Sequence, residues 1–361
     1  MTATDLFIFL PFYSPYIVQP SIFPKILLSS GVSFCCILNI DGVLTDYAIL
    51  CYNKSMGYIF LFLSVISGSI KGFFGKKISD KTSDLKSAVF ANLIRMLLCI
   101  PIGLLFVSFD GSFADLAVSG GILSISAFAG LTTSIFIVSW LLAVKNSAFT
   151  AVDTFVAMGI LVPIVLSAVF YQESVTLSQI IGLLLLFAAV MIMSAYNNQI
   201  KQKLSVSALL ILLIVGLANG LTDFSYKLFQ YNQQSTPASV FNFYIYVFSA
   251  ITLFGVFILL HLIKTKPNEY AETEKKPPLL DKRKACYIAI MALFLFCNSY
   301  FKTLASNYLT AVQIYPLAQG TAIIFTLLMS TIFFKEKIKP LCIVGLLVLF
   351  TALLLLNVVV F

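Results

Sequence analysis

Ten long apolar stretches run from residue 56 to the end of the chain, and they constrain the fold more than any other feature of the sequence. A hydrocarbon core about 30 Å thick needs roughly 20 apolar helical residues to cross it. Hydrophobic residues make up 60% of the chain, charged residues 11%, and the mean hydropathy is +1.00. This composition excludes an ordinary soluble domain and predicts an all-α polytopic membrane protein. The predicted spans are residues 56–77, 87–107, 119–143, 148–171, 177–195, 205–229, 238–263, 284–305, 308–334 and 339–361.

Two longer segments lie outside these spans. Residues 1–55 form an N-terminal extension of undefined structure, because the apolar stretch Ile26–Ile40 covers only fifteen residues and no charged region of a signal peptide precedes it. Met56 stands at the head of the first span, so it stays open whether the extension is a genuine part of the expressed protein. The segment 264–284 is rich in Lys, Glu and Pro, which predicts a solvated linker.

The last five spans repeat the first five. A shift of 151 residues places Lys76 on Lys227, and a shift of 163 places Glu173 on Glu336 and aligns GLLLLFAAV with GLLVLFTAL at six of nine positions. The second shift is larger because the charged linker interrupts only the second copy, and loop insertions cost little. Five crossings is an odd number, so the second copy must enter the membrane from the opposite face. We therefore predict two inverted five-helix repeats, at 56–195 and 205–361, joined by a short basic connection at 196–204.

The basic residues support this inversion. The first, third, fifth, seventh and ninth connections hold 17 Lys or Arg residues, whereas the other connections and the C-terminus hold none. The positive-inside rule then places the basic connections in the cytoplasm and the C-terminus outside, in a multi-pass protein of the cytoplasmic membrane. Membrane orientation thus accounts for the net charge of +8 without nucleic acid as a partner.

The two halves also carry a family resemblance. Each closes with an aromatic-x-Glu turn and a Gly-rich apolar helix, FYQESVTLSQIIGLLLLFAAV and FFKEKIKPLCIVGLLVLFTAL, and AVKNSAFTAVDTFVAMGILVP leads into the fourth span. Over about residues 56–361 these features resemble the drug/metabolite transporter superfamily, and its EamA-type branch in particular. The resemblance implies a ten-helix bundle that moves small metabolites or drugs by alternating access through a central cavity between the two halves.

Two features depart from that family. Many relatives are thought to keep both termini in the cytoplasm, whereas the lysines here place the C-terminus outside. The first span also lacks the membrane carboxylate that related small multidrug resistance proteins use for proton coupling, so proton-driven antiport is not implied.

Charged residues inside the spans are the first candidates for the transport site, because a charge in the bilayer costs roughly 2.5–3.5 kcal/mol on insertion scales. Arg95 and Asp153 lie toward the cytoplasmic ends of their spans, and Asp223 and Lys302 toward the outer ends. We expect Arg95 to pair with Asp153 and Asp223 with Lys302, and these two ion pairs, or either one, to act as opposing gates that break alternately. The alternative is static: Lys302 and Lys71 reach the interface, Asp153 caps a helix, and Arg95 binds a lipid phosphate.

Neutral polar residues form a second candidate set. Pro316 and Pro163 can kink the ninth and fourth spans toward a cavity. Together the polar residues predict a largely uncharged pocket with aromatic walls, although amides that only join helices are an equal alternative. Trp140 is interpreted as an interfacial anchor. The set comprises Asn92, Asn219, Asn242, Tyr244, Asn298, Tyr300, Gln313, Tyr315 and Gln319.

Enzymatic chemistry has little support in the sequence. The single histidine is His261, the seven cysteines lack metal-ligand spacing, and no phosphate-binding loop, zinc-protease helix or nucleophile elbow occurs. We expect a transporter with no cofactor and no metal, whose partners are a small-molecule substrate and membrane lipid. The alternative is a membrane-embedded enzyme that acts on a lipid-linked substrate through Asp153 and Asp223. Substrate, direction, coupling ion, and the choice between monomer and homodimer stay open.

Overall fold

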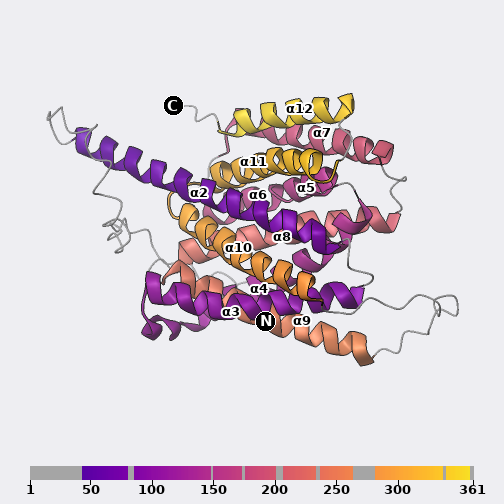
Figure 1. The fold of residues 1–361 in the computed structure, drawn as a ribbon. Helices are drawn as coiled ribbons and strands as arrows, with labels where there is room; N and C mark the ends of the chain where they lie inside the picture. The colour runs from indigo at the N-terminus through magenta and orange to yellow at the C-terminus, as the bar shows by residue number, and fades with distance from the viewer. Residues whose placement is uncertain are drawn as a thin grey trace, which may run out of the picture. The chain divides into compact units, whose positions relative to one another are not determined.

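The protein is described by a computed structural model over residues 43–79, 85–147, 149–172, 175–200, 206–232, 236–262, 281–335 and 339–357. Nearly all of these residues are helical, and none of them lies in a strand (Figure 1). The helices belong to one compact unit from Thr45 onward. Glu173, Glu336, most of the 1–55 extension and most of the 264–284 linker lie outside the described residues.

The helices confirm an all-α polytopic membrane protein. Seven are long and apolar enough to cross a membrane, and Phe155–Tyr171, Leu177–Met193 and Pro340–Leu356 form three shorter apolar segments, which gives the ten predicted crossings. The helices are α2 (Val43–Ser79), α3 (Leu85–Asp110), α4 (Gly120–Asn146), α5 (Phe149–Met158), α6 (Leu161–Tyr171), α7 (Leu177–Ile200), α8 (Val206–Asn232), α9 (Ala238–Leu262), α10 (Lys282–Ser306), α11 (Ala311–Ile332) and α12 (Pro340–Asn357), with a short 3₁₀ helix, η2 (Phe113–Leu116), between α3 and α4.

Most helix bounds lie within a few residues of the predicted spans, with two differences. Helix α2 begins at Val43, thirteen residues before the predicted start at Met56. The fourth span is divided into α5 and α6 by a turn at Gly159 and Ile160. The turn precedes Pro163, which has no N–H and cannot continue the hydrogen-bond ladder back into α5.

Polar and apolar side chains are distributed as a membrane environment requires. Large apolar residues face outward on many helices, including Leu105, Phe109 and Leu184, whose exposed fractions are 61%, 72% and 67%. Serine and threonine side chains are instead buried and hydrogen-bond to backbone carbonyls, as Ser134 does to Gly130. Lipid can solvate the outer apolar surface but cannot satisfy polar groups, so the polar groups collect inside the bundle.

Basic residues gather at one end of the bundle, which we call the basic end. Lys76 near the end of α2 donates to the Val144 carbonyl of α4 at 3.1 Å. The Lys284 ammonium at the start of α10 lies 3.2 Å from the Ser87 hydroxyl near the start of α3. The neighbouring Lys86 lies beside His261 near the end of α9. These contacts place the termini that border the first, third and seventh connections together, as the alternating charge pattern predicts.

The two repeats are visible in a pair of buried lysines. Lys76 bonds the C-terminal end of α4, the third helix of its repeat, and Lys227 donates to the Leu309 carbonyl just beyond α10, the third helix of the other repeat, at 3.0 Å. The two lysines are equivalent under the 151-residue shift, yet Lys227 lies at the end opposite the basic end. Matching contacts at opposite ends are what an inverted repeat produces.

The helix packing follows the same symmetry except at α2 and α8. Helices α3 and α9 pack together, and so do α7 and α12, which lie side by side in Figure 1. Helix α8 packs closely on α4, α5 and α6, whereas its counterpart α2 approaches no helix as extensively within the described residues. The contact at α8 depends on glycine: a Cβ atom at Gly159 would lie 2.0 Å from the Gly216 carbonyl oxygen, and one at Gly220 would lie 2.2 Å from the Gly159 carbonyl oxygen.

This contact predicts a sensitive position. Gly159→Ala places a methyl group inside the backbone of α8, so we expect it to lower the stability by about 1–3 kcal/mol or more and to reduce the yield of folded protein. The measurement is thermal unfolding in detergent. Gly255→Ala in α9 is the control, because nothing lies within 4 Å of its Cβ position. Equal melting temperatures for the two variants would contradict the close contact between α5 and α8.

Candidate functional site

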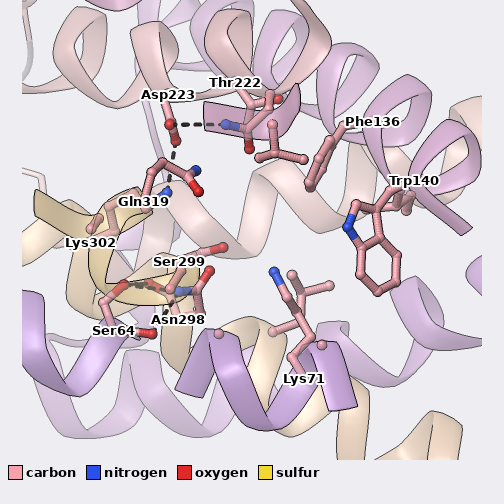
Figure 2. A pocket seen from close by; sticks show the side chains of 18 of the residues that line it. Ser64, Lys71, Phe136, Trp140, Thr222, Asp223, Asn298, Ser299, Lys302 and Gln319 are labelled. Carbon is pink, nitrogen blue, oxygen red and sulfur yellow. Dashed lines mark hydrogen bonds and ion pairs between the residues drawn. The ribbon is translucent and has the colours of Figure 1, made fainter. Parts of the chain in front are cut away.

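A central cavity of about 120 Å³ lies within the bundle. Its walls come from α2, α3, α4 and α5 of the first repeat and from α8, α10 and α11 of the second (Figure 2). Charged side chains line it together with small polar groups and aromatic rings. The cavity is therefore shared between the repeats, as the resemblance to drug/metabolite transporters implies.

An ion pair borders the cavity on the side away from the basic end. The Lys302 ammonium of α10 lies 2.9 Å from Asp223 Oδ1 of α8, and their side chains are only 11% and 2% exposed. Asn219 approaches the other carboxylate oxygen at 3.4 Å, and the Tyr315 hydroxyl of α11 donates to the Asp223 backbone carbonyl at 2.6 Å. The predicted pairing of Asp223 with Lys302 is confirmed (Figure 2). Its role as a gate stays a prediction.

The other expected pair is not present. Asp153 on α5 accepts hydrogen bonds from Trp140 Nε1 of α4, at 3.4 Å, and from the Thr326 hydroxyl of α11. Within the described residues, no hydrogen bond or ion pair joins Arg95 to Asp153. The predicted pair is therefore wrong for this structure, because neutral donors from two other helices hold the carboxylate.

Arg95 itself is deeply buried beside the cavity. Its exposed fraction is 4%, and its Nε and Nη2 atoms have no hydrogen-bond partner among the described residues. A charged group removed from water without a partner is costly, so such a residue is rarely retained for packing alone. The lipid-phosphate alternative does not fit this position, since the side chain borders the interior cavity.

Seven of the candidate residues from the sequence line the cavity. Among the neutral ones, Asn298 of α10 donates to the Ser64 carbonyl of α2 at 2.7 Å and to its hydroxyl at 2.9 Å, which holds these two helices together. Lining the cavity does not establish a role in transport, which stays a prediction for each. The seven are Arg95, Asp153, Asn219, Asp223, Asn298, Lys302 and Gln319.

The other six candidates lie in contacts between or within helices. Asn92 bonds backbone carbonyls of α3 and α4, and Asn242 joins α9 to Thr303 of α10. Gln313 accepts from the Thr310 backbone at the start of α11, and Tyr315 supports Asp223 from behind. Tyr244 donates to the Leu116 carbonyl at 2.7 Å, and the Tyr300 ring packs on Phe106 at 5.0 Å. These side chains fit the alternative in which polar groups join helices.

The sequence interpretation missed two prominent cavity residues. Lys71 of α2 points into the cavity instead of reaching the interface, and Trp140 lines the cavity at 8% exposure instead of anchoring at the membrane surface (Figure 2). Lys71 lies eight residues from the end of α2, about 12 Å at 1.5 Å per residue, a depth similar to that of Arg95. This similar depth in the membrane was the signal in the sequence that could have identified Lys71 as a cavity residue. With five charged residues on its walls, the cavity is not the uncharged pocket that the amides suggest.

Comparisons with known proteins agree with this architecture. Residues 55–195 match the EamA-like transporter family, which confirms the resemblance seen in the sequence and indicates a membrane transporter of small molecules. Among 26 matching chains of solved structures, one described only as "Crystal structure of protein" is 12% identical and superimposes with a TM-score of 0.55 over 84% of this chain and 98% of its own. At that identity the likeness shows the fold alone. No curated protein sequence matches the chain.

The buried ion pair predicts an unequal response to single and double substitution. Lys302→Met leaves Asp223 buried without its cation, so we expect the free energy of unfolding to fall by about 3–5 kcal/mol. The double variant Asp223→Leu/Lys302→Met removes both charges, and we expect it to recover most of that loss. The measurement is thermal unfolding of the purified variants.

The matched control is Lys282→Met, which removes an exposed lysine from the same helix. A Lys302→Met protein as stable as this control would show that the pair contributes nothing to the fold.

Proposed function

We propose that this protein is a secondary transporter that moves small metabolites across the cytoplasmic membrane by alternating access. The observation that carries the proposal is the polar, charged cavity in the bundle centre, whose walls come from both inverted repeats. Inverted repeats can exchange their conformations, so one fixed central site can face either side of the membrane in turn. A volume of about 120 Å³ lies below the roughly 300–1,000 Å³ of drug-sized pockets, which favours a small metabolite.

The two ends of the cavity differ in a way that supports this mechanism. On the side away from the basic end, the Asp223–Lys302 pair closes α8 against α10. Toward the basic end, Arg95 and Asp153 are separate. In the proposed cycle the Asp223–Lys302 ion pair breaks when the cavity opens outward. As the basic end closes, Asp153 gives up its hydrogen bonds from Trp140 and Thr326 for other partners.

The proposed orientation places the basic end in the cytoplasm and the C-terminus outside. Two exposed positions test it: Lys282→Cys at the start of α10 lies at the basic end, and Gly120→Cys at the start of α4 lies at the other. We expect a membrane-impermeant maleimide to label Gly120→Cys in intact cells and Lys282→Cys only after permeabilisation, with the parent chain as background. The reverse labelling pattern would show that the orientation in the membrane is opposite to the one proposed, and it would not contradict the fold.

The test of transport is untargeted metabolite profiling inside and outside cells. It compares the parent chain with the Asp223→Leu/Lys302→Met variant at matched membrane expression. We expect the parent to displace a small set of metabolites, and the variant to lose at least tenfold of that activity because it has no ion pair to break and re-form. Equal displacement by the parent and the variant would support transport but contradict a gating role for the Asp223–Lys302 pair. No displacement by the parent would count against transport.

A further inference from the structure

The cavity carries an excess of positive charge. Lys71, Arg95 and Lys302 line it with two carboxylates, Asp153 and Asp223, which leaves a formal net charge of +1. Lys302 and Asp223 neutralise each other directly. The remaining cations are Lys71 and Arg95, which come from neighbouring helices of the first repeat, α2 and α3.

Neither of these cations has a carboxylate bound to it in the described part of the chain. No hydrogen bond or ion pair is made by the Lys71 ammonium there, and two nitrogens of Arg95 have no partner. The Lys71 and Arg95 charges are close enough to repel each other, although Asp153 and Asp223 also attract Lys71 from a greater distance than a salt bridge. Arg95 is buried, whereas Lys71 is partly exposed where it lines the cavity. Two unpaired like charges in such a place repel each other, and an anion between them relieves both the repulsion and the missing hydrogen bonds.

We propose that the transported substrate is a small organic anion whose carboxylate or phosphate group binds between Lys71 and Arg95. This inference rests on the proposed transport function and adds the substrate class. The apolar part of the substrate lies against the Phe136 and Trp140 rings, which face the Lys71 ammonium across the cavity (Figure 2). Bound in this way, a monoanion brings the formal charge of the cavity to zero.

Asp153 gives the inference its sharpest test. Its carboxylate accepts hydrogen bonds from Trp140 and Thr326, and its negative charge attracts the Lys71 ammonium across the cavity. Asp153→Asn raises the formal charge of the cavity from +1 to +2. A positively charged anion site should therefore bind more tightly in this variant, whereas general damage to the protein would weaken binding.

The experiment measures equilibrium binding to the purified full chain in lipid nanodiscs. The probes are acetate, benzoate, inorganic phosphate and methyl phosphate, with acetamide, benzamide and methylamine as neutral and cationic counterparts. We expect one anion class to bind and the counterparts not to bind, and the preferred class distinguishes carboxylate from phosphate. Lys71→Gln should weaken binding about 10- to 100-fold, Lys71→Arg should restore most of it, and Asp153→Asn should strengthen it several-fold. Lys282→Gln, an exposed lysine outside the cavity, is the charge-matched control.

Equal binding of anions and their neutral counterparts, unchanged binding in Lys71→Gln, or no anion binding at millimolar concentration would each overturn the anion site. Transport is read separately, in proteoliposomes. Anion binding that depends on Lys71 but is never followed by uptake would contradict the proposed transport function alone. Uptake of neutral or cationic solutes that is insensitive to Lys71→Gln would contradict the anion site alone.

Discussion

The cost of placing charge away from water governs the interior of this protein. Five charged side chains line one cavity within a bundle whose outer surface is apolar. Each would be expensive in lipid, and each is instead turned inward to a shared polar space. Asp223 and Lys302 form an ion pair at 2.9 Å, and Asp153 accepts hydrogen bonds from neutral donors. Arg95 and Lys71 have no carboxylate bound to them in the described part of the chain. That difference separates the groups that close the structure from those available to a ligand.

The second constraint is the close approach of helices around the cavity. In lipid, apolar surface gains little from contact with other apolar surface, so helices associate through small residues and hydrogen bonds. The Gly159 turn fits directly against the Gly216 and Gly220 backbone of α8, and Ser134 and Ser249 join α4 to α9. Helix α2 instead meets α10 through side chains, chiefly the Ser64–Asn298 bonds. The helix packing is therefore tight at α8 and looser at α2, so the two halves differ in conformation, as the proposed alternating access would require.

Much of the fold could be predicted from the sequence because hydropathy, charge alternation and the internal repeat all report on single helices. The spans, the break near Pro163 and the gathering of basic residues at one end follow from these local signals. The site could be predicted less well, because it depends on the rotational orientation of each helix about its own axis. Depth along a helix placed Asp223 and Lys302 correctly, but it could not show that Trp140 turns inward to Asp153, or that Lys71 turns into the cavity. The six amides and phenols in helix contacts were indistinguishable from cavity residues for the same reason.

The repeat determines the backbone of the cavity but not its chemistry. Under the 151-residue shift Lys71 corresponds to Thr222, Gly72 to Asp223 and Arg95 to Tyr246. Under the 163-residue shift Lys302 corresponds to Ser139 and Asp153 to Pro316. None of the five charges has a charged counterpart, so the electrostatic field is asymmetric within a pseudo-symmetric frame. The unpaired cations belong to the first repeat and the closed ion pair to the second. In the proposed cycle, exchange of conformations between the halves would therefore alter access to the site while the charges proposed to hold the anion stay on one half.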